Sequence, residues 1–240
     1  MAQPDSRPAR WRVTMLGLFA MAWTMGVADA FGYDNFGVFT TNQAGNLVVF
    51  AKAPWEDWPQ ARLAGLALLG AMTGVLVGTA LSRRVTRWPG AGLALPVSLG
   101  TIGLSVAASF TIDGSRPTWL VPVMSASTAC MAAGWAHASS VKLWLTANTG
   151  GFLSTVRAIG FPDVAPGAKL GRRHLTTMAS ISAVVLTLGF VSGVFMYGLG
   201  VLDWPHPVVF AVLPAVAVSA WALRDEFRGT GLLETPAQSR

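Results

Sequence analysis

The stretch Gly26–Phe50, GVADAFGYDNFGVFTTNQAGNLVVF, decides how the chain folds, because it begins inside one long apolar run and ends inside another. Between the two runs it carries carboxylate and amide side chains, which are costly to place in apolar surroundings. These polar residues are Asp29, Asp34, Asn35, Asn42, Gln43 and Asn46. A chain that places them there needs them for its structure, for binding, or for both.

The rest of the sequence indicates that the surroundings are lipid. The chain has 240 residues, of which 52% are hydrophobic and only 12% are charged, whereas soluble domains have about 25% charged residues. A helix needs about 20 apolar residues to cross a bilayer. We therefore predict an all-α integral membrane protein with six transmembrane helices, the first extending to about Tyr33. The charge-free runs are 63–82, 88–112, 117–136 and 175–202, with 13–28 and 207–223 as a shorter pair.

The basic residues are distributed unevenly between the two sides that these spans define. The formal net charge is +6, and all but three of the 17 basic residues fall on one side. The exceptions are Lys52, Arg62 and Arg116. This is the pattern of the positive-inside rule, so it predicts cytoplasmic N- and C-termini and a membrane partner in place of nucleic acid.

The N-terminal run and the single cysteine add two expectations. The first apolar run is followed by Asp29 and no clear cleavage site, so we expect it to remain as the first span. Cys130, which lies inside an expected span, is the only cysteine in the sequence, so it can form no intrachain disulfide and belongs to no cysteine cluster that would bind metal. No cofactor is expected.

Two parts of the opening stretch recur in the second half of the chain. GVADAF at 26–31 resembles GWAHAS at 134–139, and TNQAGNLVV at 41–49 resembles TANTGGFLS at 146–154. The offsets are about 108 and about 105 residues, and a nearly constant offset indicates internal duplication.

Three spans in each half mean that the two halves enter the membrane from opposite sides. Such inverted repeats are common in secondary transporters, whose sites are built from interrupted helices. We therefore expect two inverted three-span repeats, each with a broken or re-entrant segment. The expected divisions are a cytoplasmic tail at 1–12, a first repeat at 13–112 with its broken segment at about 36–53, a second repeat at 113–223 with its broken segment at about 143–159, and a cytoplasmic tail at 224–240.

The first broken segment is expected to be interrupted at Ala44-Gly45, with a half-helix that starts near Asn46. Its counterpart would start near Gly151. Irregular backbone at membrane depth is tolerated only when protein buries it or when it lines a wet cavity, and helix N-termini favour anionic groups or carbonyl oxygens. The alternative is that both segments are loops outside the membrane.

The motif G-x-x-D-A, followed about fifteen residues later by Gly-Asn, resembles the YoaK-like family of uncharacterised bacterial inner-membrane proteins. The resemblance covers nearly the whole chain and implies a six-span fold in the bacterial plasma membrane, without implying a substrate. Ala44 stands where the family has a threonine, although Thr149 precedes Gly150 in the second half. The matching positions are Gly26, Asp29, Ala30, Gly45 and Asn46.

Asp29 is the strongest candidate for a functional residue, because an ionisable group inside a span is costly and usually faces a cavity or a partner. It would serve as a proton or cation site, or as a ligand of a polar solute. The structural alternative is that it caps the following half-helix or lies at the membrane interface. His137 occupies the equivalent place in the second half, where we expect either a group that changes charge near neutral pH, as histidines can, or an interfacial, hydrogen-bonded residue.

The remaining candidates are neutral. Their amides and hydroxyl would hydrogen-bond a polar solute or would satisfy the backbone of the broken helices, and their glycines would mark the two breaks. They are Asn42, Gln43, Gly45, Asn46, Asn148, Thr149 and Gly150. Glycines at positions 70, 74 and 78 lie on one helix face and predict close helix packing, either within the chain or across a dimer.

The sequence carries no nucleotide-binding loop, metal-ligand cluster or serine elbow, so we expect no enzymatic activity. The expected function is secondary transport of a small polar solute, with a proton as the expected coupling ion. The alternatives are a passive channel lined by two opposed half-helices and a non-catalytic accessory subunit. Expected partners are the bilayer, the solute, and either a second copy or a membrane complex.

Overall fold

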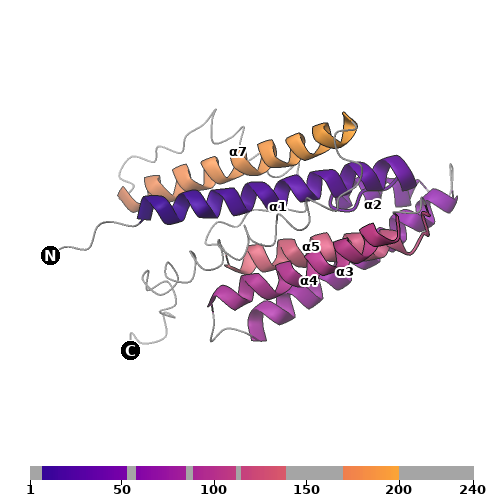
Figure 1. Ribbon diagram of the computed structural model, residues 1–240, viewed down its shortest axis with the longest axis horizontal. Coiled ribbons are helices and arrows are strands. Elements are labelled where there is room, and N and C mark those ends of the chain that lie inside the picture. The colour runs from indigo at the N-terminus through magenta and orange to yellow at the C-terminus, as the bar shows by residue number, and fades with distance from the viewer. Residues whose placement is uncertain (1–6, 53–57, 85–88, 112–114, 139–169, 200–240) are drawn as a thin grey trace.

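A computed structural model of the chain describes residues 7–52, 58–84, 89–111, 115–138 and 170–199, and these residues form helices and connecting loops without any strand (Figure 1). The helices are α1 (Arg7–Phe36), α2 (Gln43–Ala51), α3 (Trp58–Arg84), α4 (Pro89–Ser109), α5 (Leu120–Ala138) and α7 (Leu170–Gly198). The prediction of an all-helical fold is therefore confirmed for the described residues.

Membrane-spanning character follows from the length and composition of the helices. Within the described residues, three apolar stretches are long enough to cross a bilayer, namely Met15–Phe36, Trp58–Arg84 and Gly92–Ser109. Two further helices are apolar over shorter stretches, Leu120–Trp135 and Val184–Gly198. The expected sixth span, 207–223, lies outside the described residues.

Large apolar side chains also cover the outer face of α3. Leu69, Met72 and Leu76 are 61%, 62% and 69% exposed. Side chains of this kind suit contact with lipid, because lipid tails are as apolar as they are.

Glycines hold α3 against α5, so the seam at positions 70, 74 and 78 packs within the chain. A Cβ atom added to Gly70 or Gly74 would collide with the backbone of Pro122 or Ala126, and one added to Gly78 would lie 2.7 Å from the Cys130 carbonyl oxygen. The residue numbers rise together on both helices, so α3 and α5 run parallel. The glycine spacing left open whether this face packs within the chain or across a dimer, and the contact with α5 shows that it packs within the chain.

The pair α1 and α7 packs in the same way. A Cβ atom added to Gly193 would collide with the Trp23 carbonyl, and one added to Gly189 would lie 2.7 Å from the Phe19 carbonyl oxygen. A Cβ atom added to Gly26 of α1 would likewise collide with the Phe190 carbonyl. These two helices also run parallel, and Tyr197 at the end of α7 donates a 3.0 Å hydrogen bond to Asp34 Oδ2.

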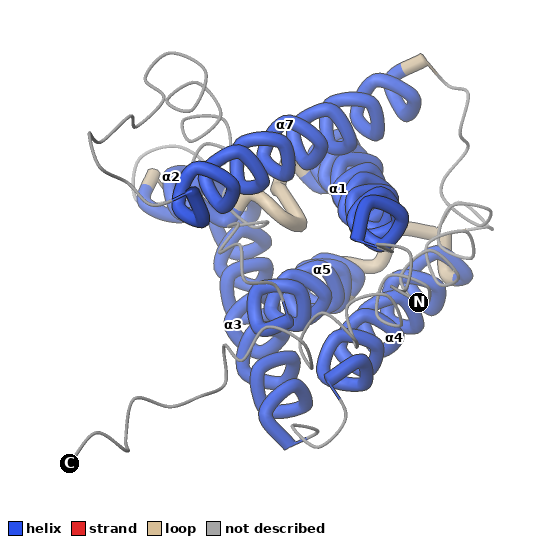
Figure 2. Tube along the Cα trace, turned by 90° about the vertical axis from the view of Figure 1, so that its left-hand side faces the viewer, coloured by secondary structure: helices blue, strands red, loops and turns tan. Residues whose placement is uncertain are grey.

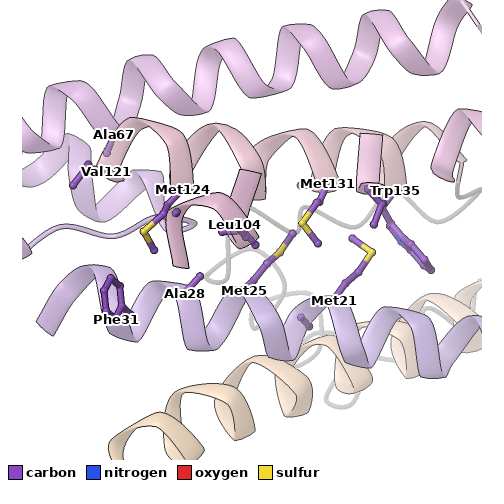
Figure 3. Close-up of a cluster of buried hydrophobic side chains, with 14 of the residues drawn as sticks. Met21, Met25, Ala28, Phe31, Ala67, Leu104, Val121, Met124, Met131 and Trp135 are labelled. Atoms are coloured by element: carbon purple, nitrogen blue, oxygen red, sulfur yellow. The ribbon is translucent and has the colours of Figure 1, made fainter. Parts of the chain in front are cut away.

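The contact between α1 and α5 is of a different kind. Figure 3 shows Met21 and Met25 of α1 facing Met124, Met131 and Trp135 of α5, and the order of the labels shows that the two helices run antiparallel. These side chains are at most 2% exposed. Long side chains therefore fill the α1–α5 interface, whereas glycines allow close backbone contact at the α3–α5 and α1–α7 interfaces. The bundle thus consists of the pair α1–α7 beside the group α3–α4–α5 (Figure 2).

Candidate functional site

The candidate site is the interruption between α1 and α2, residues 37–42, which we call the break. It begins at Gly37, whose φ of 68° is a left-handed conformation that ends α1. The Gly37 N–H bonds to the Tyr33 carbonyl at 2.9 Å, as in the usual glycine cap. The next helix, α2, then starts at Gln43.

This geometry places the interruption earlier than expected. The sequence suggested a break at Ala44-Gly45 and a helix start near Asn46, whereas both positions lie inside α2. The reason is the cap: the Asn42 side chain accepts a 3.4 Å hydrogen bond from the Gly45 N–H, which allows the helix to begin at Gln43.

Asn46 holds the break from the side of α2. Its Oδ1 accepts the Phe39 N–H at 2.8 Å, and its Nδ2 donates to the Phe39 carbonyl at 2.6 Å. The same Nδ2 donates to Gln43 Oε1 at 2.9 Å, and Gln43 in turn donates to the Thr40 carbonyl at 2.9 Å. Both amides therefore satisfy backbone groups that no helix satisfies.

Asp29 holds the break from the side of α1. Its Oδ1 accepts the N–H groups of Thr40 and Thr41 at 2.6 and 2.7 Å, and the Thr40 hydroxyl lies 3.4 Å away. None of these three bonds uses Oδ2. Asp29 is only 4% exposed, and it is the one charged side chain among the buried residues that the structure describes.

Two other helices complete the enclosure of the break. Thr128 of α5 donates to the Thr40 carbonyl at 2.9 Å, and Gln60 of α3 donates to the Gly37 carbonyl at 2.9 Å. Gly32 of α1 allows the close approach, because a Cβ atom there would lie 2.7 Å from Thr40 Cγ2. Four helices thus supply hydrogen bonds to one short irregular segment, so its backbone groups are satisfied although it belongs to no helix.

Some hydrogen-bonding capacity near the break stays unused. The hydroxyl oxygens of Thr41 and Ser125 are buried and have no hydrogen-bond partner among the described residues. The Thr41 side chain and the Asn42 backbone N–H also approach the Asp29 carboxyl, so this carboxyl has polar neighbours beyond its two short bonds. Ser125 lies on α5 one turn before Thr128, whose hydroxyl is 3.2 Å from the Ser125 carbonyl oxygen.

The structure brings together five of the nine residues that the sequence singled out. Asp29, Asn42, Gln43, Gly45 and Asn46 all lie at the break or at the start of α2. His137 lies in the last turn of α5, and its side chain is outside the described part of the molecule. Asn148, Thr149 and Gly150 belong to the expected second break and are likewise outside the described residues.

The anion-binding helix start that the sequence suggested is already occupied. The N–H of Gln43 bonds to the Thr41 carbonyl at 3.1 Å, and the N–H groups of Gly45 and Asn46 bond to the Asn42 carbonyl at 3.1 and 3.4 Å. These donors are therefore not free for a solute. Among the described residues there is also no group of three histidine, cysteine or acidic side chains that would hold a transition metal.

Sequence reasoning missed the other residues that build the site, namely Gly32, Gly37, Thr40, Thr41, Gln60 and Thr128. The one available signal was the cluster of hydroxyls, SAST at 125–128, in an otherwise apolar span. Such hydroxyls usually bond back to their own helix, so the signal alone does not point to the break.

The described residues form an all-helical structure with helices long and apolar enough to span a membrane, in which a buried carboxylate holds the connection between two helices. The sequence matches, over residues 17–223, the family described as "Protein of unknown function (DUF1275)". The chain belongs to this family. No curated protein and no solved structure matches it.

Proposed function

We propose that the protein is a secondary transporter of a small polar solute and that Asp29 carries the coupling charge. The observation that supports this most directly is that the two carboxyl oxygens of Asp29 differ in their bonds to the break. Oδ1 holds the break through two short backbone N–H bonds and Oδ2 accepts neither of them, although the Asn42 N–H and the Thr41 side chain also approach the carboxyl. A cation at Oδ2 changes the charge at the break without first breaking the bonds that keep it in place.

Inverted repeats belong to the same proposal, and the glycine contacts support them. Gly74 and Gly78 of α3 face Ala126 and Cys130 of α5, while Gly189 and Gly193 of α7 face Phe19 and Trp23 of α1. The two glycine pairs are about 115 residues apart, and the residues that they face are about 107 apart, which is the constancy expected of a duplication.

The directions of the helices agree with this relation. The pairs α3–α5 and α1–α7 are each parallel, whereas α1 and α5 run antiparallel (Figure 3). A half-turn about an axis in the membrane plane would exchange the pairs and reverse their direction, as in transporters with inverted repeats. We further propose a location in the bacterial plasma membrane with both termini cytoplasmic, on the evidence of the basic residues.

Transport is favoured over the accessory subunit because of the glycine seam. The seam on α3 was the surface that such a subunit would offer to a partner, and α5 of the same chain covers it. For the passive channel, the second of the two opposed half-helices lies outside the described residues, so no observation favours it.

The test is a charge-displacement measurement on purified protein in proteoliposomes. A neutral solute that moves together with one cation displaces net charge, so we expect transient currents that saturate with solute concentration. The solutes to be compared are sugars, polyols, primary amides and zwitterionic amino acids. In Asp29→Asn the currents should disappear, while exchange of labelled solute across the membrane should persist, because asparagine retains the acceptor oxygen that holds the break.

Three results would contradict the proposal. Currents that rise without saturation would indicate a channel. The absence of any response to all four solute classes, from protein that is folded and reconstituted, would remove transport. Full coupled currents in Asp29→Asn would show that the coupling charge lies elsewhere.

A further inference from the structure

We propose that the break contains a binding site for a small monovalent metal cation, sodium in the first instance, formed by Asp29 Oδ2 and the hydroxyl oxygens of Thr41 and Ser125. In this proposal sodium is the coupling ion of the proposed transporter, so the role of the site rests on the proposed function. Binding itself can be measured without transport.

The first argument concerns unused oxygen atoms. Asp29, Thr41 and Ser125 are 4%, 1% and 0% exposed, and the two hydroxyl oxygens have no hydrogen-bond partner among the described residues. A buried polar group without a partner costs about 1–3 kcal/mol. Thr41 lies in the break and Ser125 lies on α5, three residues before Thr128, whose hydroxyl bonds to the break; we attribute both unpartnered hydroxyls to a ligand.

The second argument is that the same chain shows what buried hydroxyls do when no ligand is involved. Within the helices they donate to the carbonyl four residues earlier: Thr24 to Ala20, Thr101 to Val97, Ser105 to Thr101 and Ser127 to Val123. The Ser125 hydroxyl makes no such bond. It lies two residues from Ser127 on the same helix, and Ser127 makes this bond at 2.7 Å.

The third argument is connectivity. The carboxyl of Asp29 is bonded to the backbone of Thr40 and Thr41, and the Thr41 side chain lies beside the same carboxyl. The Thr40 carbonyl is bonded to Thr128, one turn from Ser125 on α5. At 100° per residue, Ser125 is turned from Thr128 toward the α3-facing side of α5, which is the side from which Gln60 reaches the break.

Electrostatics selects a monovalent cation. Asp29 is the only charged group among the described buried residues, so one positive charge neutralises the site, whereas a divalent ion would leave an uncompensated charge in the interior. An anion would meet the carboxylate and would find the first N–H groups of α2 already bonded.

The ligand chemistry selects a hard, small ion. Carboxylate and hydroxyl oxygens suit hard cations, and cations in transporters of this kind bind where helices unwind. Sodium is the first ion to test, with the larger potassium as its comparison. A proton, the ion expected from the sequence, would use Oδ2 alone and would give the two hydroxyls no role.

The test compares thermal unfolding of the purified full-length protein as sodium chloride replaces potassium chloride at constant ionic strength. Binding to the folded state should raise Tm with the logarithm of sodium concentration. Ser125→Ala and Thr41→Val should each weaken the apparent sodium affinity about tenfold, the loss of one ligand. Asp29→Asn should abolish the sodium-dependent shift.

Ser127→Ala is the matched control, because it removes a buried hydroxyl two residues from Ser125 that is already bonded to its own helix at 2.7 Å. It should keep the wild-type response to sodium. Equal stabilisation of the wild type by sodium and potassium, or equal responses in Ser125→Ala and Ser127→Ala, would overturn the site. Stabilisation by acid but not by sodium, present in the wild type and absent in Asp29→Asn, would assign the position to a proton. Either of these results would leave the proposed transport function standing if solute currents were observed.

Discussion

At the scale of single residues, the polar groups of the opening stretch have a structural explanation. The break needs hydrogen-bond partners for its backbone, and amide side chains supply a donor and an acceptor from one residue. Asn46 uses both on Phe39, whereas Asn42, four residues earlier, makes one long bond of 3.4 Å to the Gly45 N–H. Loss of the Asn46 side chain would therefore leave two backbone groups without these hydrogen-bond partners, whereas loss of the Asn42 side chain would leave one.

We predict that Asn46→Ala lowers the stability of the protein much more than Asn42→Ala. The first change leaves the N–H and the carbonyl of Phe39 without partners and should cost about 2–5 kcal/mol. The second removes one weak cap and should cost about 0.5–1 kcal/mol. Thermal unfolding of the two variants in the same detergent measures the difference.

Asn46→Asp separates hydrogen bonding from packing, since aspartate has nearly the same shape. It keeps the acceptor for the Phe39 N–H and loses the donor for the Phe39 carbonyl, so its stability should lie below that of the wild type at neutral pH. Equal Tm values for Asn46→Ala and Asn42→Ala would show that Asn46 does not hold the break.

At the scale of secondary-structure elements, the positions of the spans could be predicted from the sequence. The charge-free runs 63–82 and 117–136 fall within or close to the observed helices Trp58–Arg84 and Leu120–Ala138, because lipid excludes charges from a whole span. The start of α2 could not be placed as well, since it depends on the Asn42 cap and not on hydrophobicity.

The contacts between distant elements were not predictable from one sequence. The bond from Thr128 to Thr40 joins residues 88 positions apart, and the sequence around Thr128 resembles that of any hydroxyl-containing span. The sequence indicated Asp29 as a group with a special role. Finding that Oδ1 bonds to the backbone of the break required the fold.

The glycine contacts give a prediction for the packing of α3 on α5. Gly74→Ala should destabilise the protein by about 1–3 kcal/mol, the usual cost of overpacking, because the added methyl group meets the backbone of Ala126 and not a movable side chain. Thermal unfolding and retention of the monodisperse peak on size-exclusion chromatography measure the effect.

Gly198→Ala is the control for this prediction. It lies at the end of α7 with no atom within 4 Å of the added Cβ, so the change in stability should stay within about 1 kcal/mol, the difference in helix propensity. If Gly74→Ala were as stable as Gly198→Ala, the helices would not be in the close contact that the structure shows.

At the scale of the whole molecule, the proposed topology places the ends of the described helices on defined sides of the membrane. The C-terminal end of α3 carries Arg83 and Arg84, which the positive-inside rule assigns to the cytoplasm. The N-terminal end of α3 and the connection between α4 and α5 then face outward. Trp58, which is 68% exposed, and Ser115, which is also exposed, report on these two places.

Cysteine labelling in cells tests this arrangement. The background is Cys130→Ala, because Cys130 is the only cysteine in the chain and is buried. In this background we expect Trp58→Cys and Ser115→Cys to react with a membrane-impermeant maleimide added to intact cells, and Arg84→Cys to react only after the membrane is opened. Arg84→Ala, which also loses the charge, serves with a separate tag to check that the loss of one arginine has not changed the orientation. Labelling of Arg84→Cys from outside, with Ser115→Cys protected, would reverse the topology.

Labelling of Trp58→Cys and Ser115→Cys on opposite sides would contradict the inverted repeats as well, because it would require an odd number of spans between them. The two three-span halves could then not be related by inversion.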